Sequence, residues 1–297
     1  STNGFSEFLT LSKEYKIYPL LNIEFLAFSP EHFSSGIRIN DPTNPGRIYL
    51  VGKGLNPDAK LSNKNLEIFE KAKKSNETRI RKIIDKVNDY FLSQKHEKVI
   101  TYEDIKTNSA KDFVGERHIA KEIKKIFNIF DLTEEEIRNK FLKKNGIAFV
   151  EESNDCFLSM ENCIDIIKDF QGLPCYPLLL DFKNKETTEY ERDIEALYKN
   201  LSKSGIKHIE IIPDRNNIDN VKKVIDFFDK KGFYILLGTE HNTNEMKRLR
   251  VLFQNNVELD EKAISISYKG CCSIAAHNEK NQENDIKIGD NIIKAYI

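Results

Sequence analysis

Residues 205–241 read GIKHIEIIPDRNNIDNVKKVIDFFDKKGFYILLGTEH, and this stretch contains the pattern that decides the fold. Two short and mainly apolar runs, at 209–212 and 234–237, flank a longer segment whose apolar residues recur at helical spacing. Lys231-Gly232 ends that helical segment. Mainly apolar runs of about four to eight residues are typical of strands buried on both faces. The stretch therefore predicts a strand, a helix and a second strand parallel to the first.

The same alternation continues on both sides of this stretch. A helical segment at 163–167 leads to an apolar run at 175–180, and another run, at 263–268, comes later. Two further runs, at 17–26 and 47–51, lie near the start of the chain. Because enough parallel β-α units close into a barrel, we expect a TIM-like α/β barrel with its functional groups at the carboxyl ends of the strands. An open doubly wound sheet is the alternative, but the chain has no G-x-G-x-x-G or other phosphate-binding loop.

Residues 55–148 have a different character. They are rich in Lys, Glu and Asn and have no convincing β run before their end. Thr133 and Glu136 form a capping box that opens one helix, and Asn145-Gly146 ends it. We interpret 55–148 as a helical insertion. The expected barrel then consists of residues 1–54 and 149–297.

Composition excludes several classes of protein. The 297 residues include 46 Lys and Arg against 47 Asp and Glu, so no global basic charge favours nucleic acid. No apolar run approaches the roughly 20 residues that span a bilayer, and no signal peptide is visible. The five cysteines have no C-x-x-C spacing, which argues against a zinc ribbon or a disulfide framework. We expect reduced thiols and a cytoplasmic protein.

Polar side chains gather where the predicted strands end. Two lie inside the first run, and the others follow later strands. Carboxylates, an imidazole and an arginine at one rim suit either a divalent metal or a phosphate ester. The candidates are Asn22, Glu24, Asp181, Asp214, Arg215, Asn216, Glu240 and His241.

Each candidate also has a structural alternative. Glu24 is the most informative, because a carboxylate in a buried strand is costly unless it is paired or bound to a metal. A structural ion pair is the alternative for Glu24. A helix N-cap is the alternative for residues 239–242, and a mutual pair or a cap is the alternative for Asp214 and Arg215.

Four stretches together resemble the polymerase-and-histidinol-phosphatase (PHP) superfamily. They are a helix followed by a strand with Asn22-Ile23-Glu24-Phe25, a second strand at 48–52, a helix, turn and strand at 163–177, and Gly238-Thr239-Glu240-His241. The resemblance implies a distorted (β/α)7 barrel of PHP type that holds two or three divalent metals and hydrolyses phosphate esters. It covers roughly 1–54 and 150–250.

The sequence departs from the superfamily pattern at several metal positions. The opening His-x-His and Thr-Asp-His motifs would precede Ser1, Tyr49 stands where a histidine is usual, and Thr239 replaces an aspartate. Only Glu24 and His241 carry over as metal ligands. A catalytic zinc alone takes about three protein ligands. Either a preceding segment completes the site, or the barrel has lost its metals.

We therefore expect a metal-dependent hydrolase, most readily a phosphoesterase that takes a small phosphate ester. The resemblance makes Glu24 and His241 ligands of Zn, Mn or Fe. Asp181, Asp214 and Glu240 would be catalytic, and Arg215, Asn216 and Asn22 would bind substrate, with Arg38 and Lys53 as further phosphate ligands. The main alternative is a degenerate barrel that binds a ligand or protein partner without catalysis. A metal-free lyase or isomerase on a TIM barrel is a third hypothesis. The oligomeric state stays open.

Overall fold

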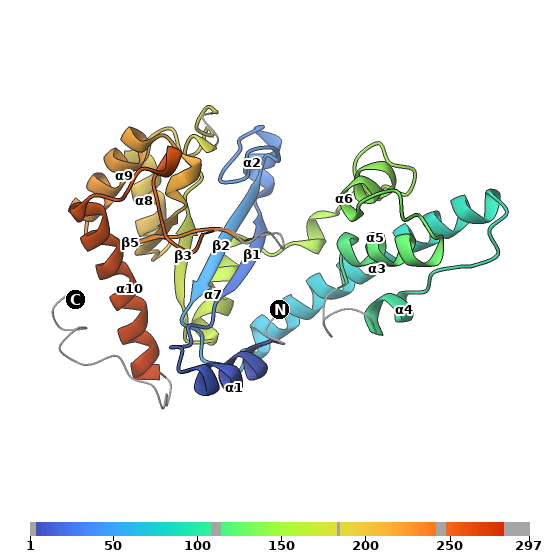
Figure 1. The fold of residues 1–297 in the computed structure, drawn as a ribbon, viewed down its shortest axis with the longest axis horizontal. Helices are drawn as coiled ribbons and strands as arrows, with labels where there is room; N and C mark the ends of the chain where they lie inside the picture. The colour runs from blue at the N-terminus through green and yellow to red at the C-terminus, as the bar shows by residue number, and fades with distance from the viewer. Residues whose placement is uncertain (1–3, 108–113, 183–184, 242–247, 282–297) are drawn as a thin grey trace. The chain divides into compact units, whose positions relative to one another are not determined.

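The computed structural model describes residues 4–107, 114–182, 185–241 and 248–281 (Figure 1). The chain divides into two compact units. One is built around residues 66–157, and the other contains residues 5–65 together with residues from 158 onward. None of the helices in the described ranges is long and apolar enough to cross a membrane.

The second unit is organised around one mixed sheet of five strands in the order of the chain. Strand β2 is antiparallel to both β1 and β3, whereas β3, β4 and β5 are parallel to one another. Strand β1 therefore runs in the same direction as β3, β4 and β5. The strands are β1 (Ile23–Phe28), β2 (Arg47–Lys53), β3 (Leu173–Pro177), β4 (His208–Ile211) and β5 (Tyr234–Leu237).

Three helices cover one face of this sheet. They are α7 (Met160–Asp169), α8 (Ile194–Lys203) and α9 (Ile218–Lys230). Residues that pair across strands share a face, and Gly52 of β2 comes so close to Ile167 of α7 that a Cβ there would lie 2.9 Å from the Ile167 side chain. The covered face carries Tyr176, Ile209 and Ile235, all fully buried. The opposite face, called the polar face below, carries Glu24, Lys53 and Glu210.

The prediction of a closed barrel is wrong. The sheet is open, and residues 263–268, expected as a strand, belong to α10 (Glu261–Asn281), which lies against β5 (Figure 1). The Leu237 N–H of β5 donates to Ser267 Oγ at 3.1 Å, and Gly270 packs directly on the Ile235 backbone. This helix takes the place on the outer edge of β5 where a further strand would hydrogen-bond. Its buried residues recur at helical spacing, at Ala263, Ile266, Gly270 and Ile274.

The remaining elements of this unit are short. Helix α1 (Phe5–Tyr15) precedes β1, and α2 (Pro30–Ser34) lies between β1 and β2. Single 3-10 turns occur at Pro213–Arg215 and Gln254–Asn256. The first of these turns directly follows β4 and therefore helps to shape the carboxyl end of the sheet.

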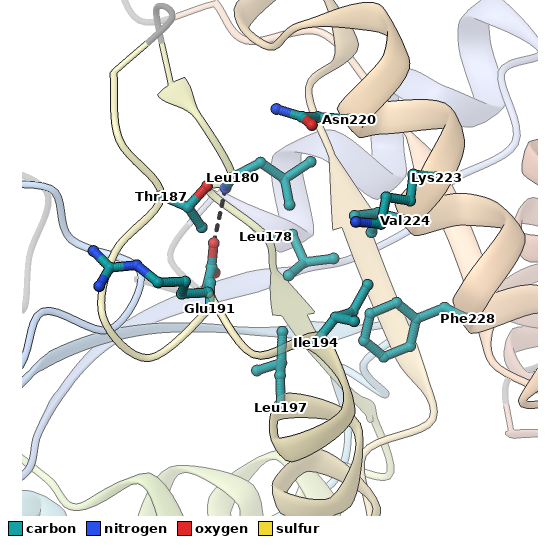
Figure 2. A pocket seen from close by; sticks show the side chains of 11 residues that line it. Leu178, Leu180, Thr187, Glu191, Ile194, Leu197, Asn220, Lys223, Val224 and Phe228 are labelled. Atoms are coloured by element: carbon teal, nitrogen blue, oxygen red, sulfur yellow. Dashed lines mark hydrogen bonds between the residues drawn. The ribbon is translucent and has the colours of Figure 1, made fainter.

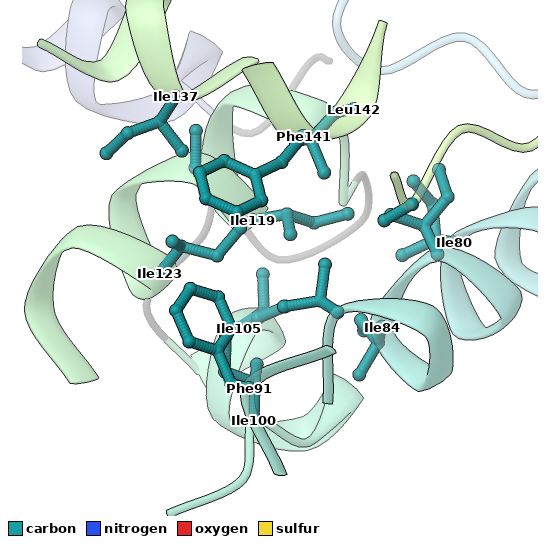
Figure 3. Close-up of a cluster of buried hydrophobic side chains, with 14 of the residues drawn as sticks. Ile80, Ile84, Phe91, Ile100, Ile105, Ile119, Ile123, Ile137, Phe141 and Leu142 are labelled. Carbon is teal, nitrogen blue, oxygen red and sulfur yellow. The ribbon is translucent and has the colours of Figure 1, made fainter. Parts of the chain in front are cut away.

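The unit around residues 66–157 is helical and has its own apolar core (Figure 3). The Phe91 and Phe127 rings stack within this core at 3.7 Å. The capping box is confirmed, because Thr133 N–H donates to Glu136 Oε2 at 2.7 Å and Glu136 N–H donates to Thr133 Oγ1 at 3.2 Å. Reading 55–148 as an insertion stays a prediction. The elements are α3 (Asn63–Ser93, which begins in the other unit), α4 (Tyr102–Thr107), α5 (Glu116–Ile126), α6 (Glu134–Ile137), a π-helical turn (Arg138–Leu142) and a 3-10 turn (Asn154–Cys156).

Replacing Gly270 by alanine tests the contact between α10 and β5. Alanine is the better helix former by about 1 kcal/mol, but a Cβ at position 270 would lie 2.1 Å from the Ile235 carbonyl oxygen. We therefore expect Gly270→Ala to lower the free energy of unfolding by roughly 1–3 kcal/mol, measured by urea unfolding. Ser265→Ala, on the exposed side of α10, is the control and is expected to be neutral or slightly stabilising. A more stable Gly270→Ala protein would contradict the close packing.

Candidate functional site

The carboxyl ends of β3, β4 and β5 bring three loops together, and this group of loops is called the rim below. Asp181, after β3, accepts the Asn217 N–H from the loop after β4 at 3.0 Å. Arg215, also after β4, forms an ion pair with Glu240, which follows β5. The Arg215 guanidinium also lies 5.3 Å from the centre of the Phe182 ring. Three predicted site residues, Asp181, Arg215 and Glu240, thus lie in loops that contact one another at the rim.

Asn216 is the most enclosed member of the rim. The residue is 1% exposed, and its Nδ2 donates to the Ile212 carbonyl at 3.1 Å. Its Oδ1 is buried without a hydrogen-bond partner in the described part of the chain. A buried acceptor left without a donor is costly, so it is a natural point for a ligand hydroxyl or amine to bind.

Two further predicted residues lie at the rim but face solvent. Asp214 is exposed in the turn after β4. His241 is also exposed, and its Nε2 lies 2.9 Å from Thr239 Oγ1. Burial lowers the pKa of Arg215, and the nearby Asp214 carboxylate opposes that effect. The rim therefore offers one partly buried cation among several acceptors.

Glu24 and Asn22 do not lie at the rim. Glu24 pairs in register with Val51 of β2. The same row of paired residues continues through β3 to the first residues of β4 and β5. Glu240 and His241, in contrast, come after the last residue of β5. Asn22 is exposed, and its Oδ1 accepts the Gly54 N–H at 3.2 Å. The structure thus places the two predicted metal ligands, Glu24 and His241, at different levels of the sheet.

Glu24 belongs instead to a charged cluster on the polar face. Lys53 Nζ lies 2.5 Å from Glu210 Oε2, and both side chains are partly buried. Burial raises the pKa of Glu24, the Glu210 carboxylate raises it further, and Lys53 opposes both effects. Burial lowers the pKa of Lys53, but the hydrogen bond and attraction to Glu210, together with Cys175 and Glu24, outweigh burial, so the pKa of Lys53 is raised overall. Lys53 therefore stays an ammonium ion that compensates two carboxylates.

Two thiols lie close to this cluster. Cys175 of β3 is fully buried, and burial raises the pKa of its thiol well above the ordinary value. Burial also raises the pKa of Cys271 on α10, with Lys53 acting in the opposite direction. Because the thiolate is the nucleophile and the metal ligand, neither cysteine is activated for such chemistry.

Our sequence reasoning missed Glu210 as a functional candidate. Glu210 stands inside a short strand between Ile209 and Ile211, which is the same signal that singled out Glu24. What the pattern did not show is that Lys53, two strands away, reaches Glu210 across β3.

The residues of this cluster do not fit a catalytic metal. A divalent ion at Glu24 and Glu210 would have to displace the Lys53 ammonium, and a catalytic zinc takes about three protein ligands. Within the described ranges, no group of three or more His, Cys, Asp or Glu side chains could hold a metal ion. His241 at the rim is not part of the Glu24 cluster.

Comparison with solved structures finds a protein of similar fold, whereas the sequence comparisons find no match. No known protein-family profile matches the chain, and no curated protein is similar to it in sequence. A solved structure of a candidate metal-dependent phosphoesterase from Bifidobacterium adolescentis is similar, with a TM-score of 0.55 and 14% sequence identity. The similarity covers 89% of this chain and 80% of that protein. At this identity the likeness concerns the fold alone.

One buried carboxylate shapes the approach to the rim. Glu191 is 4% exposed and accepts the Tyr176 hydroxyl at 3.0 Å and the Leu180 N–H at 2.8 Å. It therefore holds the backbone directly before Asp181. Burial raises the pKa of Glu191 to about 7, although these hydrogen bonds act in the opposite direction.

Glu191→Gln tests this titration. Because the pKa is raised on folding, the folded protein binds the Glu191 proton more tightly than the unfolded chain. The bound proton contributes on the order of 3 kcal/mol to the free energy of unfolding. This contribution is fully present below about pH 4.5 and is lost as the pH rises to about 7. We expect the stability deficit of Glu191→Gln, measured by urea unfolding, to be larger at pH 5 than at pH 8. A deficit that does not change with pH would contradict the raised pKa.

Proposed function

We propose that this chain binds a small phosphate ester at the rim and does not hydrolyse it with a bound metal. The observation that carries the second half of the proposal is the Lys53 ammonium, 2.5 Å from Glu210 and next to Glu24. Where the resemblance predicts a metal-bridging glutamate, this chain supplies its own positive charge. The carboxylates there are compensated without a divalent ion.

The rim supports the first half of the proposal. Ligands of open α/β sheets bind beyond the carboxyl ends of parallel strands, and the rim stands at that position. Arg215 presents a planar fork that suits a phosphate group. In this structure Glu240 engages Arg215, so a phosphate would compete with Glu240 for the guanidinium. The Asn216 Oδ1, which has no hydrogen-bond partner among the described residues, would accept a hydroxyl or amine of the same ligand.

Paired substitutions at the rim test phosphate binding. Phenyl phosphate, titrated by calorimetry, is expected to bind the wild type, to bind Arg215→Gln at least tenfold more weakly, and to bind Glu240→Gln more tightly. Arg215→Gln weakens binding because it removes the cation. Glu240→Gln strengthens binding because it removes the carboxylate that competes with the phosphate for Arg215.

Arg81→Gln is the matched control, because Arg81 forms an exposed pair with Glu77 at 2.7 Å in the other unit. It is expected to leave phenyl phosphate binding unchanged. Weaker binding by Glu240→Gln would count against the competition between Glu240 and the phosphate.

Metal-dependent phosphoester hydrolysis is the second candidate function, and the fold similarity to a candidate metal-dependent phosphoesterase favours it. In that case Glu24 and His241 would be metal ligands, and Asp181, Asp214 or Glu240 would act on the attacking water. Glu24 and His241 lie at different levels of the sheet, so each would need other ligands. Such a site would need further metal ligands, because the described residues contain no group of three or more His, Cys, Asp or Glu side chains that could hold an ion.

Metal content separates the two functions. Plasma mass spectrometry of protein purified without chelators should find well below one equivalent of zinc, manganese or iron in the wild type. Lys53→Ala is expected to gain thermal stability from added Mn²⁺, because the ion would then compensate Glu24 and Glu210, and binding to the folded state stabilises it. About one equivalent or more in the wild type, lost in Glu24→Gln, would instead establish the hydrolase.

A further inference from the structure

A small cavity opens on the helix-covered side of the sheet, between the end of β3 and helices α8 and α9 (Figure 2). Its volume is about 120 Å³. Leu178, Leu197, Val224 and Phe228 form an apolar floor, and all four are buried. The cavity is lined from within one unit and lies away from the Glu24 cluster, which occupies the opposite face.

The charged residues that line the cavity are unevenly placed. Arg192 and Lys223 are exposed, so they stand at the mouth, and neither has an ion-pair partner in the described ranges. Glu191 is the acidic residue of the lining. It is buried, and its oxygens already accept the Tyr176 hydroxyl and the Leu180 N–H. Acidic residues nearby in the sequence are engaged elsewhere: Asp193 caps α8, and Glu195 pairs with Lys231 at 3.1 Å.

The size of the floor limits what can enter. An apolar cavity of about 150 Å³ in another protein accommodates benzene, so this cavity of about 120 Å³ limits the buried part of a ligand to at most a single ring or a short branched chain. Burying such a group removes apolar surface of both the ligand and the floor from water. The two cations at the mouth favour a negative head group and oppose a positive one, and the arginine fork matches the two oxygens of a carboxylate.

We propose that this cavity binds a small organic monoanion, with a compact apolar body on the Leu178–Phe228 floor and a carboxylate held by Arg192 and Lys223. The polar side chains of Thr187 and Asn220 also line the cavity and are available to the same head group. The cavity shares the loop after β3 with the rim, but Asp181, Arg215, Asn216 and Glu240 do not line it. It does not depend on whether the rim binds a phosphate ester.

Three probes of one shape test the class of ligand. Benzoate, benzamide and benzylamine share the ring and differ in the charge of the head group. Titrated into the full-length protein and followed by calorimetry, benzoate is expected to bind saturably, benzamide at least tenfold more weakly, and benzylamine not at all. Equal binding of benzamide, or binding of benzylamine, would overturn the assignment to anions. No saturable binding of benzoate would overturn the site.

Variants of the mouth and the floor locate the binding. Arg192→Gln and Lys223→Gln change exposed residues, so both should fold normally, and each is expected to weaken benzoate binding, with a larger loss in the double variant. Lys199→Gln, an exposed lysine of α8 outside the lining, is the matched control and should bind benzoate as the wild type does. Thr187→Phe at the half-exposed edge and Val224→Phe on the floor, checked for folding by circular dichroism, should abolish binding. Unchanged affinity in the double variant or in both filled variants would refute the proposal.

Discussion

The contact between α10 and the outer edge of β5 is the constraint on which the rest of the architecture depends. An edge strand exposes backbone donors and acceptors that would otherwise pair with a further strand. Here Ser267 accepts one of those N–H groups, and the missing side chain of Gly270 lets the helix reach the strand backbone. With this edge covered by a helix, the sheet ends at β5 and stays open. The described part of the chain therefore forms a five-stranded sheet with two unequal faces.

The polar face then has to accommodate partly buried charge in contact with protein atoms. Glu24 and Glu210 repel each other, and the Lys53 ammonium offsets that repulsion from β2. Because Lys53 balances the charge of the two carboxylates, the cluster does not depend on a bound ion. The proposal of binding without metal-assisted hydrolysis rests on this charge balance.

The rim, the polar face and the cavity on the helix-covered face thus offer different chemistry. The rim has a cation, Arg215, held by Glu240. The Asn216 amide oxygen, next to Arg215 in the sequence, has no hydrogen-bond partner among the described residues. The cavity between β3, α8 and α9 combines an apolar floor with two exposed cations, Arg192 and Lys223. Glu191 connects them structurally, because it lines the cavity and also holds the backbone that leads to Asp181.

The sequence by itself determined the local elements. It predicted β5 at 234–237, the amphipathic helix before it, and the Thr133–Glu136 capping box, because apolar spacing and capping act over a few neighbouring residues. It also placed Asp181, Arg215 and Glu240 together, since parallel strands end at a common edge. Only the tertiary structure decided the antiparallel direction of β2, the helix at 263–268, the separation of Glu24 from His241 and the Lys53–Glu210 pair. Those features arise from pairing and packing between residues far apart in the chain, which local periodicity does not encode.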